Sequence, residues 1–270
     1  MRQPSSASAS ASAFSFSSAS GYASAAIAAV TAIGLSIAGC GGGQHAASTT
    51  SATTSATTSK PPLAEGALAG LLLKPAQIDS ALGVTGTTVD KPIDHPNTDS
   101  PADVFPATYK FPDECLFIMG AAEEAVYKGS GNTAVRGESV VAPRQSGSDD
   151  PTPKVIQAVV LFPSADQANA FFTASSRHWS ACANRQDTVG GEGDSAKLTW
   201  KVGAVSNATG VLSTIVDLSL GSGAQSMTQS CQRALTVRNN VVIDTAAYRK
   251  DPGNVAVDVA EQIAGNVDTQ

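Results

Sequence analysis

Residues 231–247 of the chain read CQRALTVRNNVVIDTAA. Apolar residues make up half of 231–238 and most of 241–247, and asparagine tolerates the positive backbone φ of a tight hairpin. The stretch therefore predicts two antiparallel strands, 231–238 and 240–247, joined by a short turn.

Similar patterns occur on the N-terminal side of this hairpin. Strands are predicted at 133–142, 154–162, 197–205 and 211–220, and the first two are separated by the polar loop 143–153. Because consecutive strands joined by short turns pair with each other, these stretches predict a largely antiparallel sheet.

Helical periodicity appears before and after the strands. A helix is predicted from Ser164, where Gln167 completes the pattern of a capping box. Its core-facing stripe consists of Ala168, Phe171, Phe172, Ser175, Trp179 and Cys182. Further helices are predicted at 75–83, 114–126 and 254–267, and residues 91–113, with five prolines, are predicted to be a long loop. The fold class is therefore α+β, with a twisted, largely antiparallel sheet and helices packed on one face.

The chain divides into three parts by composition. Residues 1–39 end in an uncharged apolar run (22–39), residues 40–62 are rich in Gly, Ser, Thr and Ala, and residues 63–270 carry the periodic patterns. The middle part has too few bulky apolar side chains to offset its ordering entropy, so it is expected to be a flexible tether. The last part suits one domain of ordinary size.

Cys40 ends the apolar run in the order Ile37-Ala38-Gly39-Cys40. This arrangement resembles the lipobox of bacterial lipoprotein signal peptides, in which the chain is cut before the cysteine and the thiol receives a diacylglycerol. The resemblance implies that 1–39 is a signal peptide, that Cys40 is lipidated, and that the protein is anchored on the extracytoplasmic face of the cell membrane.

The charge of the chain limits its partners. After removal of 1–39, 16 Lys and Arg face 23 Asp and Glu, which gives a formal net charge of −7. An acidic chain of this kind is not expected to bind nucleic acid.

Three cysteines remain after Cys40, at positions 115, 182 and 231. In an oxidising compartment a disulfide between two of them is expected, and Cys182, at the end of a core-facing stripe, is well placed for a partner. The cysteines are far apart in sequence and no histidines stand at i, i+4, so we predict no metal site and no cofactor.

The sequence contains no hydrolase, metalloprotease or phosphate-loop motif. Two features are candidate catalytic groups. Asp187, Glu192 and Asp194 form an acidic cluster interpreted as a solvated loop, and His178 is a possible general base interpreted as a residue at the rim of the core. We therefore predict no catalytic residue and no enzymatic activity.

Several short segments together resemble one known family. They are Leu71-Leu72-Leu73 followed by Pro75-Ala76-Gln77-Ile78, the run 158–165 (AVVLFPSA), Trp179-Ser180-Ala181-Cys182, the run 231–235 (CQRAL) and the run 240–244 (NVVID). Their order and spacing are similar to those of the PknH-like extracellular domain, the sensor domain of an actinobacterial Ser/Thr kinase that also occurs alone in lipoproteins. The likeness covers about 68–268.

The resemblance implies an α+β domain with a cleft and a sensing or ligand-binding role. Family members often have two disulfides in this domain, and with three cysteines one must be absent. The resemblance favours Cys115–Cys182, with Cys182–Cys231 as the rival pair.

Three functions are considered. The first is a membrane-anchored sensor or binding module for an unknown cell-envelope ligand or protein. The second is a lipid or glycolipid carrier, and the third is an envelope hydrolase that uses the acidic cluster or His178. The carrier requires an apolar cavity, whose candidate lining is Val159, Leu161, Val216, Leu218 and Val242.

Overall fold

The computed structural model describes residues 60–98, 105, 106, 108–146, 150–190, 197–222 and 225–270. Cys40 and the predicted signal peptide and tether up to residue 59 lie outside the described residues, as do Glu192 and Asp194. No helix in the described ranges has the length and apolar character needed to cross a membrane.

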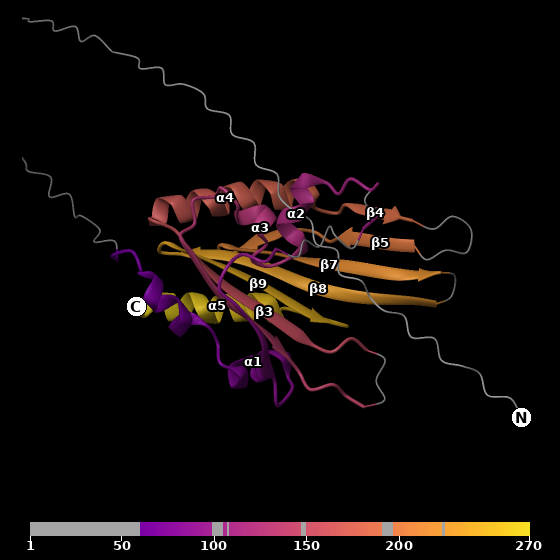
Figure 1. Cartoon of the computed structure of the whole chain (residues 1–270), viewed down its shortest axis with the longest axis horizontal. Helices are drawn as coiled ribbons and strands as arrows, with labels where there is room; N and C mark the ends of the chain where they lie inside the picture. The colour runs from indigo at the N-terminus through magenta and orange to yellow at the C-terminus, as the bar shows by residue number, and fades with distance from the viewer. Residues whose placement is uncertain (1–59, 99–104, 107, 147–149, 191–196, 223–224) are drawn as a thin grey trace, which may run out of the picture. The chain divides into compact units, whose positions relative to one another are not determined.

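The centre of the domain is one antiparallel sheet (Figure 1). The strands follow the order β1-β2-β3-β9-β8-β7-β5-β4, and β6 pairs with β7 outside this path. Their bounds are β1 Thr88–Ile93, β2 Ala134–Val141, β3 Lys154–Leu161, β4 Gln186–Val189, β5 Lys197–Val202, β6 Ser206–Ala208, β7 Val211–Ser222, β8 Gln225–Arg238 and β9 Val241–Arg249.

The predicted hairpin is present. Arg238 pairs with Val241, so Asn239 and Asn240 form the two-residue turn between β8 and β9, and Asn239 has a φ of 50°. Asn240 is buried and donates to the Phe162 carbonyl at 2.8 Å, so the turn is also bonded to the end of β3. The prediction of a largely antiparallel sheet is confirmed.

Three strands were not predicted: β1, β4 and β6. The prediction of a loop over residues 91–113 was wrong at its start, because β1 continues to Ile93. Five of the six β1 residues are exposed, and the residues of β4 and β6 are almost all exposed. Edge strands with two solvated faces show no apolar alternation, so periodicity cannot detect them.

Five of the six residues in the predicted stripe of the helix after Ser164 are buried, and Phe172 is partly exposed. The helices are the 3-10 helix η1 Glu65–Leu71, then α1 Pro75–Leu82, α2 Asp113–Met119, α3 Glu124–Tyr127, α4 Ala165–Cys182 and α5 Val255–Asp268. Ser164 Oγ accepts a hydrogen bond from the Gln167 amide at 3.3 Å and caps α4. Gly83 ends α1 with a φ of 66°, a conformation that favours glycine.

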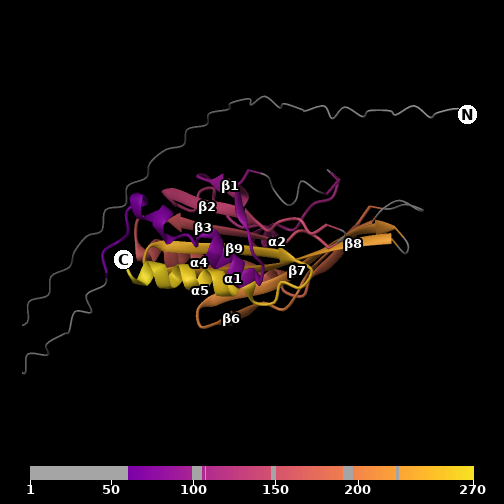
Figure 2. The same cartoon turned by 90° about the horizontal axis from the view of Figure 1, so that it is seen from below.

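The helices cover both faces of the sheet, whereas the sequence predicted one face. One apolar cluster joins η1, α1 and α5 to one face, and a second joins α2, α3 and α4 to the other (Figures 1 and 2). The reason lies in the central strands: Val155 and Val159 of β3 belong to the first cluster, while Ala158 and Val160 belong to the second. A strand that is apolar on both faces requires a cover on both.

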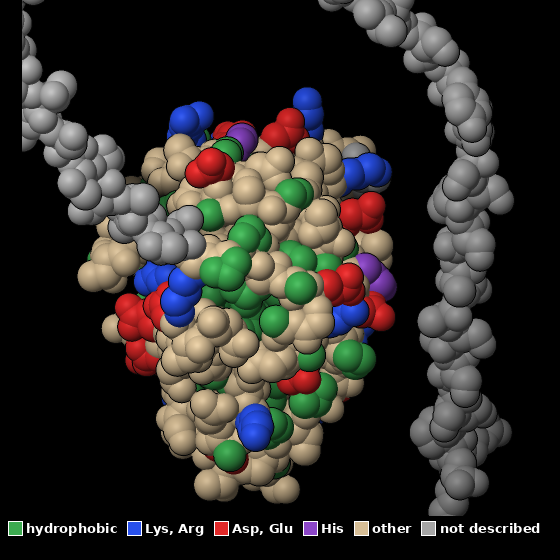
Figure 3. Space-filling view, turned by 90° about the vertical axis from the view of Figure 1, so that its left-hand side faces the viewer, with side chains coloured by type: hydrophobic (Ala, Val, Ile, Leu, Met, Phe, Trp, Pro, Cys, Tyr) green, Lys and Arg blue, Asp and Glu red, His purple; other side chains and the backbone are tan. Residues whose placement is uncertain are grey.

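The N-terminal end of the described chain lies beside the β8–β9 turn. Asn239 Nδ2 donates to the Pro61 carbonyl at 2.7 Å, and the Leu63 amide donates to Asn240 Oδ1 at 2.8 Å. Lys60 and Asp268 also form a hydrogen bond at this end. Figure 3 shows the end of the molecule that lies to the left in Figure 1, where acidic and basic side chains are interspersed.

Candidate functional site

A groove opens on the sheet face that carries α2 and α4, beyond the ends of these helices. Its volume is about 800 Å³. One wall is built by β5, β7 and β8, and the other by residues on either side of the gap in the connection between β2 and β3. The lining residues are Leu198, Leu218, Leu220, Met227, Thr228 and Gln229 on the first wall and Arg144, Asp150, Pro151 and Thr152 on the second.

The register of the sheet explains why the first wall is apolar. Leu198 of β5 pairs with Leu220 of β7, which in turn pairs with Met227 of β8. These three side chains therefore form a row across adjacent strands. Leu220 is 49 % exposed and Met227 71 % exposed, so the row is open to solvent. Such exposed apolar rows commonly mark binding surfaces.

The second wall carries charge. Within the described part of the chain, Arg144 has no hydrogen bond or ion pair, although it lines the groove. Asp150 forms an ion pair with Lys250, with an N–O distance of 3.2 Å. The connection between β2 and β3 also borders a smaller hollow of about 270 Å³, lined in part by Arg249 and Lys250. The net charge along this wall is therefore positive.

The covered part of the same sheet face begins at a small buried cluster. Ala121 packs against Cys231 of β8 and Ala246 of β9, with Ile156 and Tyr248 partly buried beside them. Cys231 lies two residues inward from Gln229, on the same side of β8, so this cluster is the next step along the strand from the groove. The segment that carries Ala121 therefore covers the sheet up to Cys231, and the groove begins beyond this point.

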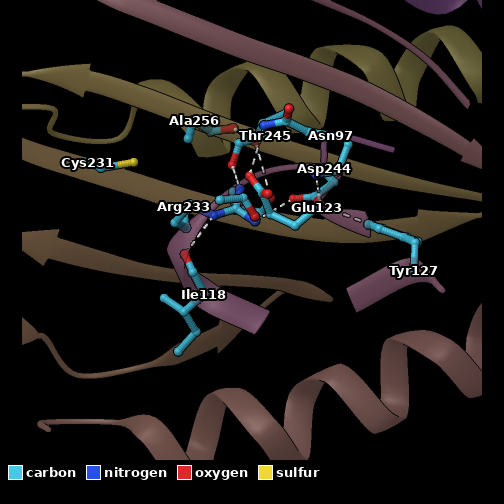
Figure 4. Close-up of polar contacts among 12 residues, drawn as sticks. Asn97, Ile118, Glu123, Tyr127, Cys231, Arg233, Asp244, Thr245 and Ala256 are labelled. Atoms are coloured by element: carbon cyan, nitrogen blue, oxygen red, sulfur yellow. Dashed lines mark hydrogen bonds and ion pairs between the residues drawn. The ribbon is translucent and has the colours of Figure 1, made fainter. Parts of the chain in front are cut away.

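A buried arginine fixes this segment. Arg233 lies on the same side of β8 as Cys231, and its side chain is 1 % exposed. It donates to the carbonyls of Ile118 at 2.9 Å and Gly120 at 2.6 Å, and to Asp244 Oδ1 at 2.7 Å (Figure 4). A further hydrogen bond joins it to the Thr245 carbonyl. One side chain therefore joins β8, β9 and the end of α2.

The partner carboxylate fixes the other side of the segment. Asp244 Oδ2 accepts from the Ala122 amide at 2.8 Å and from the Tyr127 hydroxyl at 3.0 Å. Burial, followed by the Asp244 charge, raises the pKa of Tyr127 well above its usual value, so the hydroxyl remains a donor at neutral pH. The Arg233–Asp244 pair has its hydrogen bonds satisfied on both sides, as a buried ion pair requires.

Gly120 breaks the helix predicted over 114–126 into α2 and α3. A Cβ atom at this position would lie 2.0 Å from Glu123 Oε1, so a side chain cannot be accommodated without displacing Glu123. The Asn97 side chain donates to Glu123 Oε1 at 3.4 Å. The Asn97 backbone amide donates to the Ala122 carbonyl, and the Asn97 carbonyl accepts from the Glu124 amide. The 120–124 segment is therefore held by hydrogen bonds with Arg233 of β8, Asp244 of β9 and Asn97.

The disulfide joins α2 to α4. Cys115 and Cys182 are bonded, with a Cα–Cα distance of 5.2 Å, as the family resemblance favoured. The rival pair Cys182–Cys231 is not formed, because Cys231 is a free, buried cysteine on β8. Burial raises the pKa of Cys231 to about 11, so its thiol is neutral and unreactive at physiological pH.

The candidate residues for a hydrolase do not form a site in the described residues. The His178 ring stacks on Phe117 of α2, with 3.9 Å between ring centroids. Asp187 lies in β4, where Oδ2 accepts from the Tyr109 hydroxyl at 2.8 Å, and that hydroxyl accepts from Trp200 Nε1 at 2.9 Å. The described ranges also contain no group of three or more potential metal-ligating side chains.

Of the five residues proposed to line a lipid cavity, only Leu218 lines the groove. Val159 and Leu161 pack in the cluster under α1 and α5, while Val216 and Val242 pack in the cluster under α2 and α4. These four side chains are buried core residues, because their strands are covered by helices at those positions.

Sequence reasoning missed most of the groove and the buried ion pair. Residues 225–230 (QSMTQS) are too polar to predict the outer half of β8, which carries Met227. A signal for the ion pair was present: Arg233 and Asp244 are charged residues in the interior of predicted strands, a position that charged residues occupy when they are paired.

Comparisons with known proteins show which family the chain resembles. The family model described as the PknH-like extracellular domain matches residues 63–266. The serine/threonine-protein kinases PknH of Mycobacterium bovis and Mycobacterium tuberculosis are each 32 % identical to the chain over 209 residues, or 77 % of it. The match covers only 32 % and 30 % of the two kinases, so the chain spans about a third of the length of these curated relatives.

A solved structure is also similar. The crystal structure of the extracellular domain of PknH from Mycobacterium tuberculosis aligns with 78 % of this chain and 99 % of that chain, at 30 % sequence identity and a TM-score of 0.64.

Proposed function

Because the chain belongs to the family of PknH-like extracellular domains, we propose that it is a lipid-anchored, extracytoplasmic binding module of the sensor type. In this proposal residues 1–39 are a signal peptide, Cys40 carries the acyl chains, residues 40–62 form the tether and residues 63–270 form the sensor domain. The apolar run before Ile37-Ala38-Gly39-Cys40 supports the anchor. The PknH kinases carry a matching domain in a much longer chain.

The observation that carries the binding role is the open groove of about 800 Å³, whose apolar row Leu198–Leu220–Met227 faces solvent. Ligand pockets typically measure about 300–1,000 Å³ and combine apolar walls with a few polar groups. The described lining residues include no histidine or cysteine, and their carboxylate, Asp150, is paired with Lys250. Binding without catalysis is therefore the function that this lining supports best.

The anchor predicts a direct effect of Cys40→Ser. Wild-type chain expressed in an actinobacterial host should incorporate labelled palmitate and fractionate with membranes, because a doubly acylated cysteine is a stable anchor. The Cys40→Ser chain should incorporate no label and leave the membrane fraction. Cys231→Ser, which changes a buried cysteine, is the matched control and should remain labelled. Equal labelling of wild type and Cys40→Ser would refute the anchor.

If the groove binds a ligand, that ligand is expected to co-purify with the protein. Chain purified from producing cells should carry ligand detectable by mass spectrometry of its organic extract, and Leu220→Asp should lose it, because a carboxylate in the apolar row repels an apolar ligand. Val89→Asp is the matched control, since Val89 is 42 % exposed on β1, outside the groove. Identical extracts from wild type and Leu220→Asp would contradict a ligand site here.

A further inference from the structure

We propose that the groove binds a long-chain fatty acid, with its acyl chain along the row Leu198–Leu220–Met227 and its carboxylate at Arg144. This inference rests on the proposed function and specifies the ligand class of the same site.

The apolar wall fits a single extended hydrocarbon chain. Adjacent strands are about 4.8 Å apart, so the row of three side chains from β5, β7 and β8 spans on the order of 10 Å, and Leu218 widens it towards the covered part of the sheet. Met227 has a flexible thioether side chain that adapts to irregular apolar partners. A narrow, open and continuous apolar row of this kind offers contact to a chain of methylene groups along its length.

The opposite wall supplies one uncompensated cation. Arg144 has no partner among the described residues, whereas Asp150 is neutralised by Lys250 at 3.2 Å. This cation stands in a chain whose formal net charge is −6. A guanidinium group presents two parallel N–H donors that match the two oxygens of a carboxylate. An apolar row facing a single free guanidinium is complementary to an apolar chain with one anionic head.

Two other ligand classes fit less well. An extended peptide gains its affinity by pairing with a sheet edge, but the groove lies on the face of β5, β7 and β8, whose backbones are paired to each other. A neutral apolar molecule would use the row but leave the Arg144 side of the groove without a function. The volume of about 800 Å³ is large enough for one chain.

The test uses the full chain with Cys40→Ser, so that no acyl group of its own competes for the groove. The fluorescent fatty acid cis-parinaric acid is titrated first, and palmitate and hexadecanol are then compared as competitors. Palmitate is expected to bind roughly tenfold more tightly than hexadecanol, because only the acid can form a charge-assisted pair with Arg144. In Arg144→Gln the two competitors should bind equally, and at the affinity of hexadecanol for the parent chain.

Chain length and the apolar row give independent readouts. Each methylene added to the competitor should strengthen binding by about two- to fourfold until the row is covered. Met227→Ser should weaken palmitate and hexadecanol to the same extent, because it shortens the apolar row without adding a charge, while Met227→Leu should bind both as the parent does. Val89→Asp should change neither.

Three results would overturn the proposal: no saturable binding of cis-parinaric acid, equal affinities of palmitate and hexadecanol in the parent chain, or an equal effect of Arg144→Gln on both. A wrong fatty-acid assignment can be distinguished from a wrong assignment of the groove as a ligand site. If a co-purified compound is still lost in Leu220→Asp, the groove is a ligand site and only the fatty-acid assignment is wrong. If that loss is also missing, the groove is not a ligand site.

Discussion

Replacing Cys115 and Cys182 together by alanine is expected to lower the free energy of unfolding by about 4 kcal/mol. The two cysteines are 67 residues apart, and a cross-link that closes a loop of this length removes a large conformational entropy from the unfolded chain. Both side chains are fully buried between α2 and α4, so the alanines also lose packing contacts. Urea or guanidinium unfolding of the oxidised wild type and the double variant measures the difference.

The matched control is Cys231→Ala, which removes a buried sulfur without removing a cross-link. It should cost much less, about 1 kcal/mol, as expected for a small cavity. Reductant should lower the unfolding free energy of the wild type by as much as the Cys115→Ala/Cys182→Ala change does. It should lower the unfolding free energy of Cys231→Ala by the same amount, because that variant keeps the disulfide. A double variant no less stable than Cys231→Ala would contradict a stabilising role for the disulfide.

Arg233→Met is expected to cost about 3–5 kcal/mol of unfolding free energy, because it leaves the Asp244 carboxylate buried without its cation. The carbonyls of Ile118 and Gly120 lose their donors at the same time. Since these carbonyls lie at the end of α2, hydrogen exchange of the 120–124 segment should accelerate more than that of α5, on the other face of the sheet.

A double-mutant cycle separates the interaction energy of the Arg233–Asp244 pair from the other destabilising effects of each substitution. Asp244→Leu alone should also be strongly destabilising, while the two changes together should cost less than the sum of the single effects by about 1–3 kcal/mol. The control is Arg185→Met, which breaks the exposed pair of Arg185 with Glu114 and should cost at most about 1 kcal/mol. Additive effects at Arg233 and Asp244, or equal effects at Arg185 and Arg233, would show that the buried pair has no special role.

The sequence was informative wherever one side of an element is buried and the other is solvated. The stripe of α4 was predicted almost residue by residue, since Phe171 and Trp179 are buried in the core while most of the polar positions between them are not. The edge strands β1 and β4 were missed because their residues are almost all exposed. The two-sided cover of the sheet was missed because a short run of valines does not reveal which faces are covered.

The site was less predictable than the fold for a related reason. The apolar row of the groove is one residue from each of three strands, and only the pairing register brings Leu198, Leu220 and Met227 together. The disulfide came from family resemblance, because the positions of Cys115 and Cys182 in sequence do not reveal that α2 and α4 are neighbours. Arg233 and Asp244 were visible as isolated charges, but their partners are mostly backbone atoms that no side-chain pattern indicates.

Strand β8 has the groove at one end and the turn that holds Pro61 at the other. With a rise of about 3.3 Å per residue, the stretch from Met227 to Arg238 spans roughly 35 Å. In the proposed lipid-anchored form the tether would join the domain at this turn, so the groove would open at the end of β8 that is farther from the point of attachment. Because the tether is expected to be flexible, this separation would leave the mouth of the groove accessible to a ligand in any orientation of the domain.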